Sequence, residues 1–211
     1  MGLKIDFHVH TCYSKDSSIT LEQVVSFAKK RGLDGVAITD HNSVEGALKL
    51  KTKEIIVIPG IEVSTLQGHL LGINLTTPIP AKLSMEETIQ QIHEAGGIAV
   101  AAHPTAFYKS PATRKVTSYD AVEVMNAASI PFSVLTHYSR KFAEQLNLPQ
   151  TGGSDSHYAP EIGSAYTVVD ADPNIDEIAK AVIRGATSPR GKGIPFKIRV
   201  KRSISKFKRK M

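Results

Sequence analysis

Nine side chains of the kinds that bind transition metals stand where short apolar segments of the sequence end. They are His8, His10, Asp16, His41, Glu62, His69, His103, Asp155 and His157. Six of the eight histidines belong to this set, which leaves only His93 and His137 to be read as ordinary helix residues. Imidazole and carboxylate ligands together favour Zn, Mn or Fe over Ca or Mg. The sequence therefore predicts a hydrolytic site that holds more than one metal ion.

The elements that must position these ligands alternate along the chain. Short β-type segments predict strands at 3–9, 35–39, 55–58, 61–64, 69–74, 98–102, 121–125, 150–152 and 165–169. Two capping boxes, a proline after an N-cap and apolar periodicity predict helices at 21–30, 44–51, 84–95, 131–146 and 172–184. This alternation predicts a parallel sheet. Since ligands follow at least six strands, those strands must share a mouth, and an α/β barrel provides one where an open sheet does not.

Length and composition favour one domain with a substantial core. The chain has 211 residues, of which 41% are hydrophobic. A single cysteine excludes an intramolecular disulfide. No run approaches the roughly 20 apolar residues of a membrane span, and the N-terminus lacks the pattern of a signal peptide. We therefore expect a cytoplasmic protein.

Six motifs resemble those of a known family, and they occur in the family's order. They are Asp6-Phe7-His8-Val9-His10-Thr11, Thr39-Asp40-His41, Gly60-Ile61-Glu62, Gly68-His69, Ala102-His103-Pro104 and Gly153-Ser154-Asp155-Ser156-His157. They resemble the motifs of the polymerase and histidinol phosphatase (PHP) superfamily, from Leu3 to about Arg184. The resemblance implies a distorted barrel of seven strand–helix units that holds two or three divalent ions.

The resemblance also implies how the ligands are shared among the ions. The first ion would take His8, His10, Glu62 and Asp155. The second would share Glu62 and add His69 and His103, and the third would take Asp16, His41 and His157. One departure concerns the acid after the second histidine. Many relatives have it five residues on, where this chain has Lys15, and Asp16 follows.

The activity implied is a metal-dependent phosphoesterase that hydrolyses phosphomonoesters with metal-activated water. Catalytic roles are expected for Asp40, His41, Glu62 and Asp155, with Asp40 also a carboxylate that orients a histidine ligand. Substrate contacts are expected for Lys109, Arg114 and Asn126. Lys109 and Arg114 are equally consistent with solvated loop residues, and Asn126 with a turn residue at a strand end.

The substrate follows less directly from the sequence. There is no polymerase domain and no long insertion between Glu62 and His103 that would form a lid. An open site favours nucleotides or similar small phosphates. Alternatives are an exonuclease acting on short RNA or DNA ends, and a non-catalytic nucleic-acid-binding subunit on the same barrel. A metallohydrolase of C–N bonds fits less well, because no lysine is placed to bridge two metals.

The last 22 residues form a separate electrostatic unit. Residues 190–211 hold ten of the 26 Lys and Arg and none of the 20 acids, so residues 1–189 carry 16 basic and 20 acidic side chains. We expect a barrel at 1–189 and a basic C-terminal tail at 190–211. Alternation of Ile194, Phe196, Ile198 and Val200 with basic residues predicts an edge strand. The tail is consistent with a solvated terminus, a grip on RNA or DNA, or contact with an anionic membrane.

Overall fold

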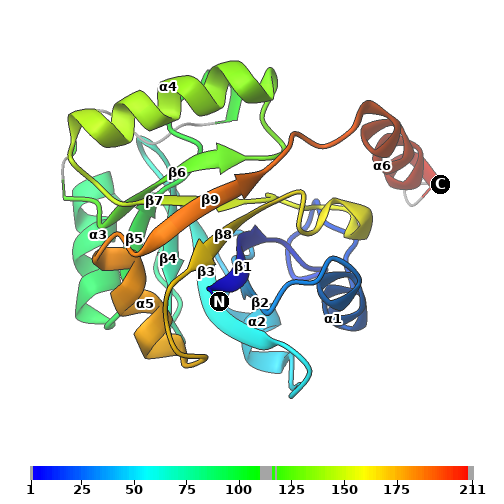
Figure 1. The fold of residues 1–211 in the computed structure, drawn as a ribbon, viewed down its shortest axis with the longest axis horizontal. Helices are drawn as coiled ribbons and strands as arrows, with labels where there is room; N and C mark the ends of the chain where they lie inside the picture. The colour runs from blue at the N-terminus through cyan, green and yellow to red at the C-terminus, as the bar shows by residue number, and fades with distance from the viewer. Residues whose placement is uncertain (1, 110–115, 117, 209–211) are drawn as a thin grey trace.

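The computed structural model describes residues 2–109, 116 and 118–208. The strands are β1 (Leu3–Val9), β2 (Gly35–Ile38), β3 (Ile56–Thr65), β4 (Gly68–Ile73), β5 (Ile98–Ala101), β6 (Ala121–Asn126), β7 (Gln150–Gly153), β8 (Ala165–Val169) and β9 (Thr187–Gly191). The α-helices are α1 (Leu21–Lys30), α2 (Glu45–Lys49), α3 (Met85–Glu94), α4 (Phe132–Gln145), α5 (Ile175–Ile183) and α6 (Phe196–Lys208), and two 3₁₀ turns lie at η1 (Phe107–Lys109) and η2 (Ala159–Glu161). Figure 1 shows the helices outside a strongly curved sheet, with α6 standing apart at the C-terminal end. None of the helices in the described residues is long and apolar enough to cross a membrane.

The sheet curls until its two ends meet. In the described residues the strand order is β7-β6-β5-β4-β3-β2-β1-β8-β9. Just beyond β7, Asp155 donates its backbone N–H to the carbonyl of His8, and His10 donates to that of Ser156. At the other edge, the Thr187 hydroxyl of β9 donates to the carbonyl of Gln150 in β7. The predicted α/β barrel is therefore confirmed, in a nearly closed form.

The prediction of a parallel sheet is wrong for half of the strand pairings. Four pairs are parallel, and β3/β4, β4/β5, β1/β8 and β8/β9 are antiparallel. Only two residues separate Thr65 of β3 from Gly68 of β4. A two-residue connection can join only antiparallel strands, because a parallel crossover needs a dozen residues or more.

Two strands predicted around Pro59-Gly60 are one continuous strand that changes partner there. Residues 56–59 of β3 pair with β2, and residues 60–65 pair with β4. A proline cannot donate to a ladder, so the changeover is a place where it is tolerated. A Cβ at Gly60 would lie 2.7 Å from the carbonyl oxygen of Gly72, so this close approach requires glycine.

The sequence also misplaced two features near the C-terminus. Helix α5 is capped by Asn174, whose side chain accepts the N–H groups of Asp176 and Glu177, and not by Asp172 as predicted. The predicted edge strand is wrong, because Phe196–Lys208 forms helix α6. The alternation over four residues is also the start of a helical stripe, which continues to Ile204 and Phe207.

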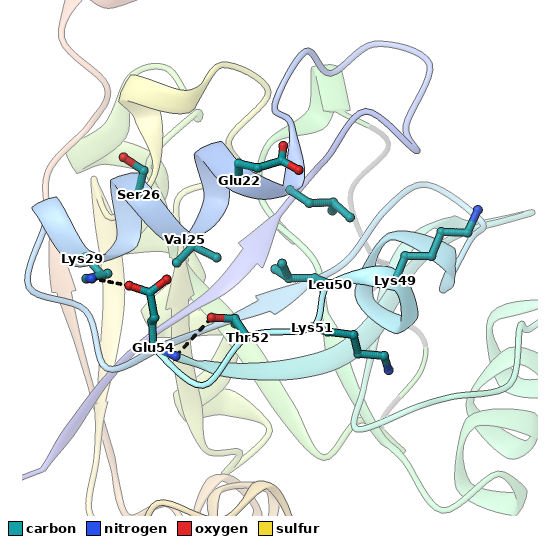
Figure 2. Close-up of a pocket in the computed structure, with 10 residues that line it drawn as sticks. Glu22, Val25, Ser26, Lys29, Lys49, Leu50, Lys51, Thr52 and Glu54 are labelled. Atoms are coloured by element: carbon teal, nitrogen blue, oxygen red, sulfur yellow. Dashed lines mark hydrogen bonds and ion pairs between the residues drawn. The ribbon is translucent and has the colours of Figure 1, made fainter.

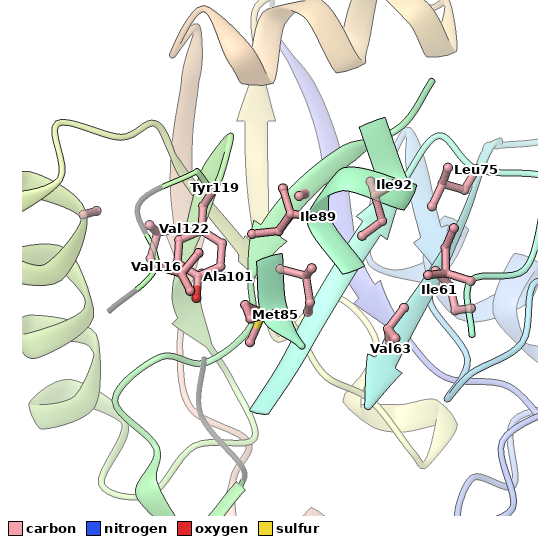
Figure 3. Close-up of a cluster of buried hydrophobic side chains, with 14 of the residues drawn as sticks. Ile61, Val63, Leu75, Met85, Ile89, Ile92, Ala101, Val116, Tyr119 and Val122 are labelled. Carbon is pink, nitrogen blue, oxygen red and sulfur yellow. The ribbon is translucent and has the colours of Figure 1, made fainter. Parts of the chain in front are cut away.

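Apolar side chains fill the space between the sheet and the helices. Figure 3 shows one cluster, in which Ile89 and Ile92 of α3 approach Ile61 of β3 and Val122 of β6. All four side chains are buried. The strands are therefore held from their outer face, which leaves their ends free to carry polar residues.

Candidate metal centre

The predicted ligands come from different strands but gather at one end of the barrel. His8 lies in β1, Glu62 in β3 and His69 in β4, and the others follow β1, β2, β5 or β7. Because β4 runs antiparallel to β3, its early residue His69 pairs with Ser64, near the end of β3. The structure brings all nine predicted ligands together through side-chain separations of 3.7 Å or less.

The deepest group consists of His8, His10, Glu62 and Asp155. The Nε2 atoms of His8 and His10 lie 3.0 Å apart. Glu62 Oε2 lies 3.2 Å from Nε2 of His10 and 3.5 Å from that of His8. Asp155 Oδ1 lies 3.4 Å and 3.7 Å from the same two nitrogens. Four potential ligand atoms thus face one small volume.

Glu62 extends this group in two directions. Its Oε1 lies 3.0 Å from Nδ1 of His69 and 3.1 Å from Nε2 of His103. Its Oε2 lies 3.0 Å from Nδ1 of His41. The side chain is only 2% exposed, so its two oxygens are committed to different histidines. This is the arrangement expected of a carboxylate that bridges two cations.

A third group lies nearer the solvent. Asp16 Oδ2 is 3.1 Å from Nε2 of His157 and 3.6 Å from Nε2 of His41. The loop between His10 and Asp16 accommodates its additional residue in two consecutive turns. The Ser14 N–H donates to the carbonyl of Thr11, and the Ser17 N–H donates to the carbonyl of Ser14. The one-residue displacement of this acid therefore does not remove it from the site.

Two of the ligands have a backbone conformation that L-residues seldom adopt. His103 has φ of 30° and Asp155 has φ of 52°. Such conformations carry strain and tend to occur where function fixes the direction of a side chain. Both side chains point into the ligand cluster, in keeping with that pattern.

A buried carboxylate that the sequence analysis missed supports the deepest group. Glu123 in β6 accepts from Nδ1 of His8 at 2.9 Å and from the backbone N–H of His103 at 2.9 Å. Asn126 donates its amide to Glu123 at 3.0 Å and to Asp155 Oδ2 at 3.1 Å. The available signal was a single acid within the apolar strand AVEVM. Asn126 itself is buried and holds two carboxylates.

Asp40 supports the site from the opposite side of His10. Its carboxylate accepts from the Thr11 N–H and hydroxyl, each at 2.6 Å, and from the Ser14 hydroxyl at 2.7 Å. Ser14 Oγ lies 3.2 Å from Nδ1 of His10. Asp40 is fully buried. Asp40 is therefore linked to His10 through Ser14, a residue that the sequence did not single out.

The electrostatics of the cluster favour positive charge. Burial lowers the pKa of His8, but Glu123, Asp155 and Glu62 outweigh it and raise this pKa well above its ordinary value. Burial raises the pKa of Glu62, yet His8 and the hydrogen bonds from neighbouring histidines hold it well below normal. The field that would protonate His8 is the field that attracts a metal cation.

The hydrogen-bond partners show that the cluster fits metal ions. Glu123 is an acceptor, so it assigns the ring proton of His8 to Nδ1. Ser14 gives its own proton to Asp40 and so accepts from Nδ1 of His10. When both rings are neutral, as metal ligands must be, both Nε2 atoms present lone pairs to the same small volume. Their separations resemble the edge of about 3.3 Å of a tetrahedron with metal–ligand bonds of about 2.0 Å.

Seven of the nine predicted ligands, all except the more deeply buried His8 and His10, line a cleft of about 610 Å³. Tyr108, Ile130 and three basic residues of α6, namely Arg199, Arg202 and Lys206, share its lining. From the sequence, these three residues belonged to the basic C-terminal tail and were not assigned to the site. Of the predicted substrate contacts, the side chain of Lys109 and all of Arg114 lie outside the described residues.

A second hollow of similar volume shows what the cleft has in addition. It measures about 580 Å³ and lies between α1 and the segment from Lys49 to Glu54. Figure 2 shows Lys29 directed at Glu54, with Lys49 and Lys51 directed outward. Its lining contains no histidine. Size alone therefore does not distinguish the candidate site, whereas its ligand chemistry does.

Comparisons with known proteins agree with this geometry. An uncharacterized protein of Methanocaldococcus jannaschii is 38% identical over 141 residues, which cover 59% of this chain and 82% of that protein. A phosphoribosyl 1,2-cyclic phosphate 1,2-diphosphodiesterase of Eggerthella lenta is 31% identical over 99 residues, which cover 42% of this chain and 37% of that enzyme.

A solved structure shares the fold. It is a two-domain protein of Bacteroides vulgatus that contains a predicted PHP-like metal-dependent phosphoesterase. It superposes with a TM-score of 0.71 at 21% identity, over 91% of this chain and 65% of that one. The family model for the PHP domain matches residues 6–145, and the PHP-associated model matches residues 137–187. The chain therefore belongs to the PHP domain family.

Proposed function

We propose that this protein is a metal-dependent phosphoesterase that hydrolyses phosphomonoesters of nucleotides or similar small molecules. The observation that carries the proposal is the convergence of ring nitrogens and carboxylates around Glu62. His8, His10, Glu62 and Asp155 would hold one ion, Glu62, His69 and His103 a second, and Asp16, His41 and His157 a third. Zn, Mn and Fe suit this ligand set.

When bound, such ions supply positive charge for phosphoryl oxygens and lower the pKa of water toward 7. The chain's own residues hold the ligands in place. Glu123 fixes the ring of His8, and Asp40 fixes that of His10 through Ser14. Asp40 is buried and accepts three hydrogen bonds, so it is better placed to orient His10 than to move a proton.

Asn126 is better placed to position Asp155 and Glu123 than to contact substrate, because both carboxylates accept from its amide. The cleft is open and partly lined by basic residues, which favours a nucleotide-sized anion. A phosphodiesterase acting on RNA or DNA ends is the second candidate. The basic helix at the cleft and the name of the Eggerthella lenta relative favour it. We also propose that the basic tail contacts nucleic acid and that the protein is cytoplasmic.

The test is metal analysis followed by a phosphate-release screen with nucleotides, sugar phosphates, cyclic phosphates and short RNAs. Glu62→Ala should lose at least one bound ion and reduce turnover by at least about 100-fold, because it removes a ligand to two ions. Glu54→Gln, in the second hollow, is the matched control and should retain both metal and activity. Near-normal turnover by metal-loaded Glu62→Ala protein would refute the proposal.

A further inference from the structure

Helix α6 contacts the barrel through Arg199, Arg202 and Ile198, and leaves most of its apolar side chains exposed. Phe196 and Phe207 are 79% and 67% exposed, and Val200 and Ile204 are exposed as well. Helix α5, in contrast, buries its apolar residues Ile178 and Val182. Burial of apolar surface would turn the stripe of α6 inward. The observed orientation instead directs arginines and a lysine at the cleft.

Specific contacts fix this orientation. The Arg199 guanidinium donates to the backbone carbonyls of Ile194, Ala128 and Ala127 at 3.0, 3.0 and 3.1 Å. Ile194 in turn donates its N–H to the carbonyl of Ala127. Arg199 thus donates to two carbonyls of the segment that follows β6 and to one carbonyl of the segment that follows β9. It is a positioning residue for the helix.

Arg202 joins the helix to the loop that carries two of the ligands. Its Nη1 lies 3.3 Å from the fully buried carboxylate of Glu161. Glu161 also accepts the backbone N–H of His157 at 3.0 Å. Arg202 has four further N–H donors, and its side chain is 33% exposed at the cleft.

One turn further on, Lys206 is exposed and lines the same cleft. Among the described residues, no carboxylate forms an ion pair with it. The predicted metal ligands form the floor of this cleft, and helix α6 with Arg202 and Lys206 forms one wall. Such a cleft has two places for negative charge. The floor suits a scissile phosphate, and the wall suits a second anionic group on the same molecule.

We infer that Arg202 and Lys206 form a second anion subsite, which selects substrates that carry a second phosphate group. The inference rests on the proposed function. Arg202 supplies planar paired donors suited to phosphate oxygens, and Lys206 supplies a mobile ammonium. The family-model matches end at residue 187, so these residues lie outside the part of the chain that defines the family.

The experiment compares substrates that differ by one phosphate. Each nucleoside or hexose bisphosphate is compared with the corresponding monophosphate. The effect of the second phosphate is thereby separated from the effect of the nucleoside or sugar. For the metal-loaded wild-type protein, we expect a lower KM for the bisphosphate of at least one pair. Lys206→Gln should raise that KM by about 3- to 10-fold and leave kcat unchanged, with less than a twofold change for the monophosphate.

Lys201→Gln is the matched control, because Lys201 is exposed on the same helix but does not line the cleft. Arg202→Gln should act in the same direction as Lys206→Gln, and its metal content shows whether the His157 loop is intact. Equal effects on both members of a pair, or no effect of either variant, would overturn the inference.

Calorimetric binding of the bisphosphate to metal-loaded protein tests the subsite without turnover. If no phosphate ester is hydrolysed, the proposed function fails, while weaker binding by Lys206→Gln still supports the subsite. If turnover is normal and binding is the same in wild type, Lys206→Gln and Lys201→Gln, only the subsite fails. The two proposals can therefore be rejected separately.

Discussion

The floor and the wall of the cleft are built in different ways. The floor consists of the predicted ligands, which lie on or just after six strands, and several of them are almost fully buried, as His8 and Glu62 are. Some of them are held by a second layer of buried side chains, such as Glu123 behind His8. The wall is one helix with exposed apolar residues, fastened by Arg199 and the ion pair between Arg202 and Glu161.

This difference suggests a division of labour. A ligand cluster must be rigid before a metal arrives, so its residues belong on strands of a closed barrel with buried partners. A group that only selects among substrates can sit on a surface helix. The floor lies within residues 6–187, which match the family models, and the wall lies beyond them. Changes to the floor should therefore affect metal binding, and changes to the wall should affect substrate preference.

The largest effect in this comparison is expected from the layer beneath the floor. Glu123→Gln keeps the shape of the side chain but replaces one carboxylate oxygen by an NH2 group. That group cannot accept the hydrogen bond that Glu123 now accepts from Nδ1 of His8 or from the His103 N–H. Loss of such a partner typically weakens metal affinity or activity by 10- to 100-fold. The measurement is zinc or manganese affinity by competition with a chelator.

Asp120→Asn is a suitable control, since Asp120 accepts from His93 and the Ala99 N–H but touches no ligand of the cluster. We expect it to retain metal affinity. If Glu123→Gln binds metal as tightly as Asp120→Asn does, the buried layer does not prepare the site, and the contrast with the wall disappears.

A smaller effect is expected when the wall is removed. The chain should be ended after Pro195, because β9 pairs with β8 and Ile194 is buried. Metal content should be unchanged, whereas KM for a bisphosphate should rise by about 10-fold. Arg199→Gln should show part of this effect, because it releases the helix. Loss of bound metal on truncation would show that the wall also supports the floor.

The sequence predicted the floor of the cleft better than it predicted the wall. The predicted ligands were identifiable because each lies within or after a short apolar strand, and the capping boxes at Thr20 and Ser84 gave the starts of α1 and α3. These are local signals. The antiparallel direction of β4 was also encoded, in the two-residue connection after Thr65, but the regular alternation of strands and helices obscured it.

The rest depended on tertiary contacts that no local pattern contains. Glu123 supports His8 across 115 residues of chain, and Ser14 supports His10 only because Asp40 takes its proton. The direction of α6 could not be derived from its apolar stripe, because the contacts of Arg199 and Arg202 determine it. The sequence therefore predicted the residues that gather at the site and the supporting role of Asp40, but not the support from Glu123 and Ser14 or the wall.

The smallest expected effect is that of salt concentration on KM, which should act on the wall and not on the floor. The Debye length falls from about 10 Å at 0.1 M to about 3 Å at 1 M, and exposed charges are screened far more than buried ones. KM for a bisphosphate should therefore rise by about two- to fivefold over this range of KCl, while bound metal stays constant. Lys206→Gln should flatten that dependence, because it removes an exposed charge of the wall. A salt dependence equally steep in the variant would place the screened attraction at the floor instead.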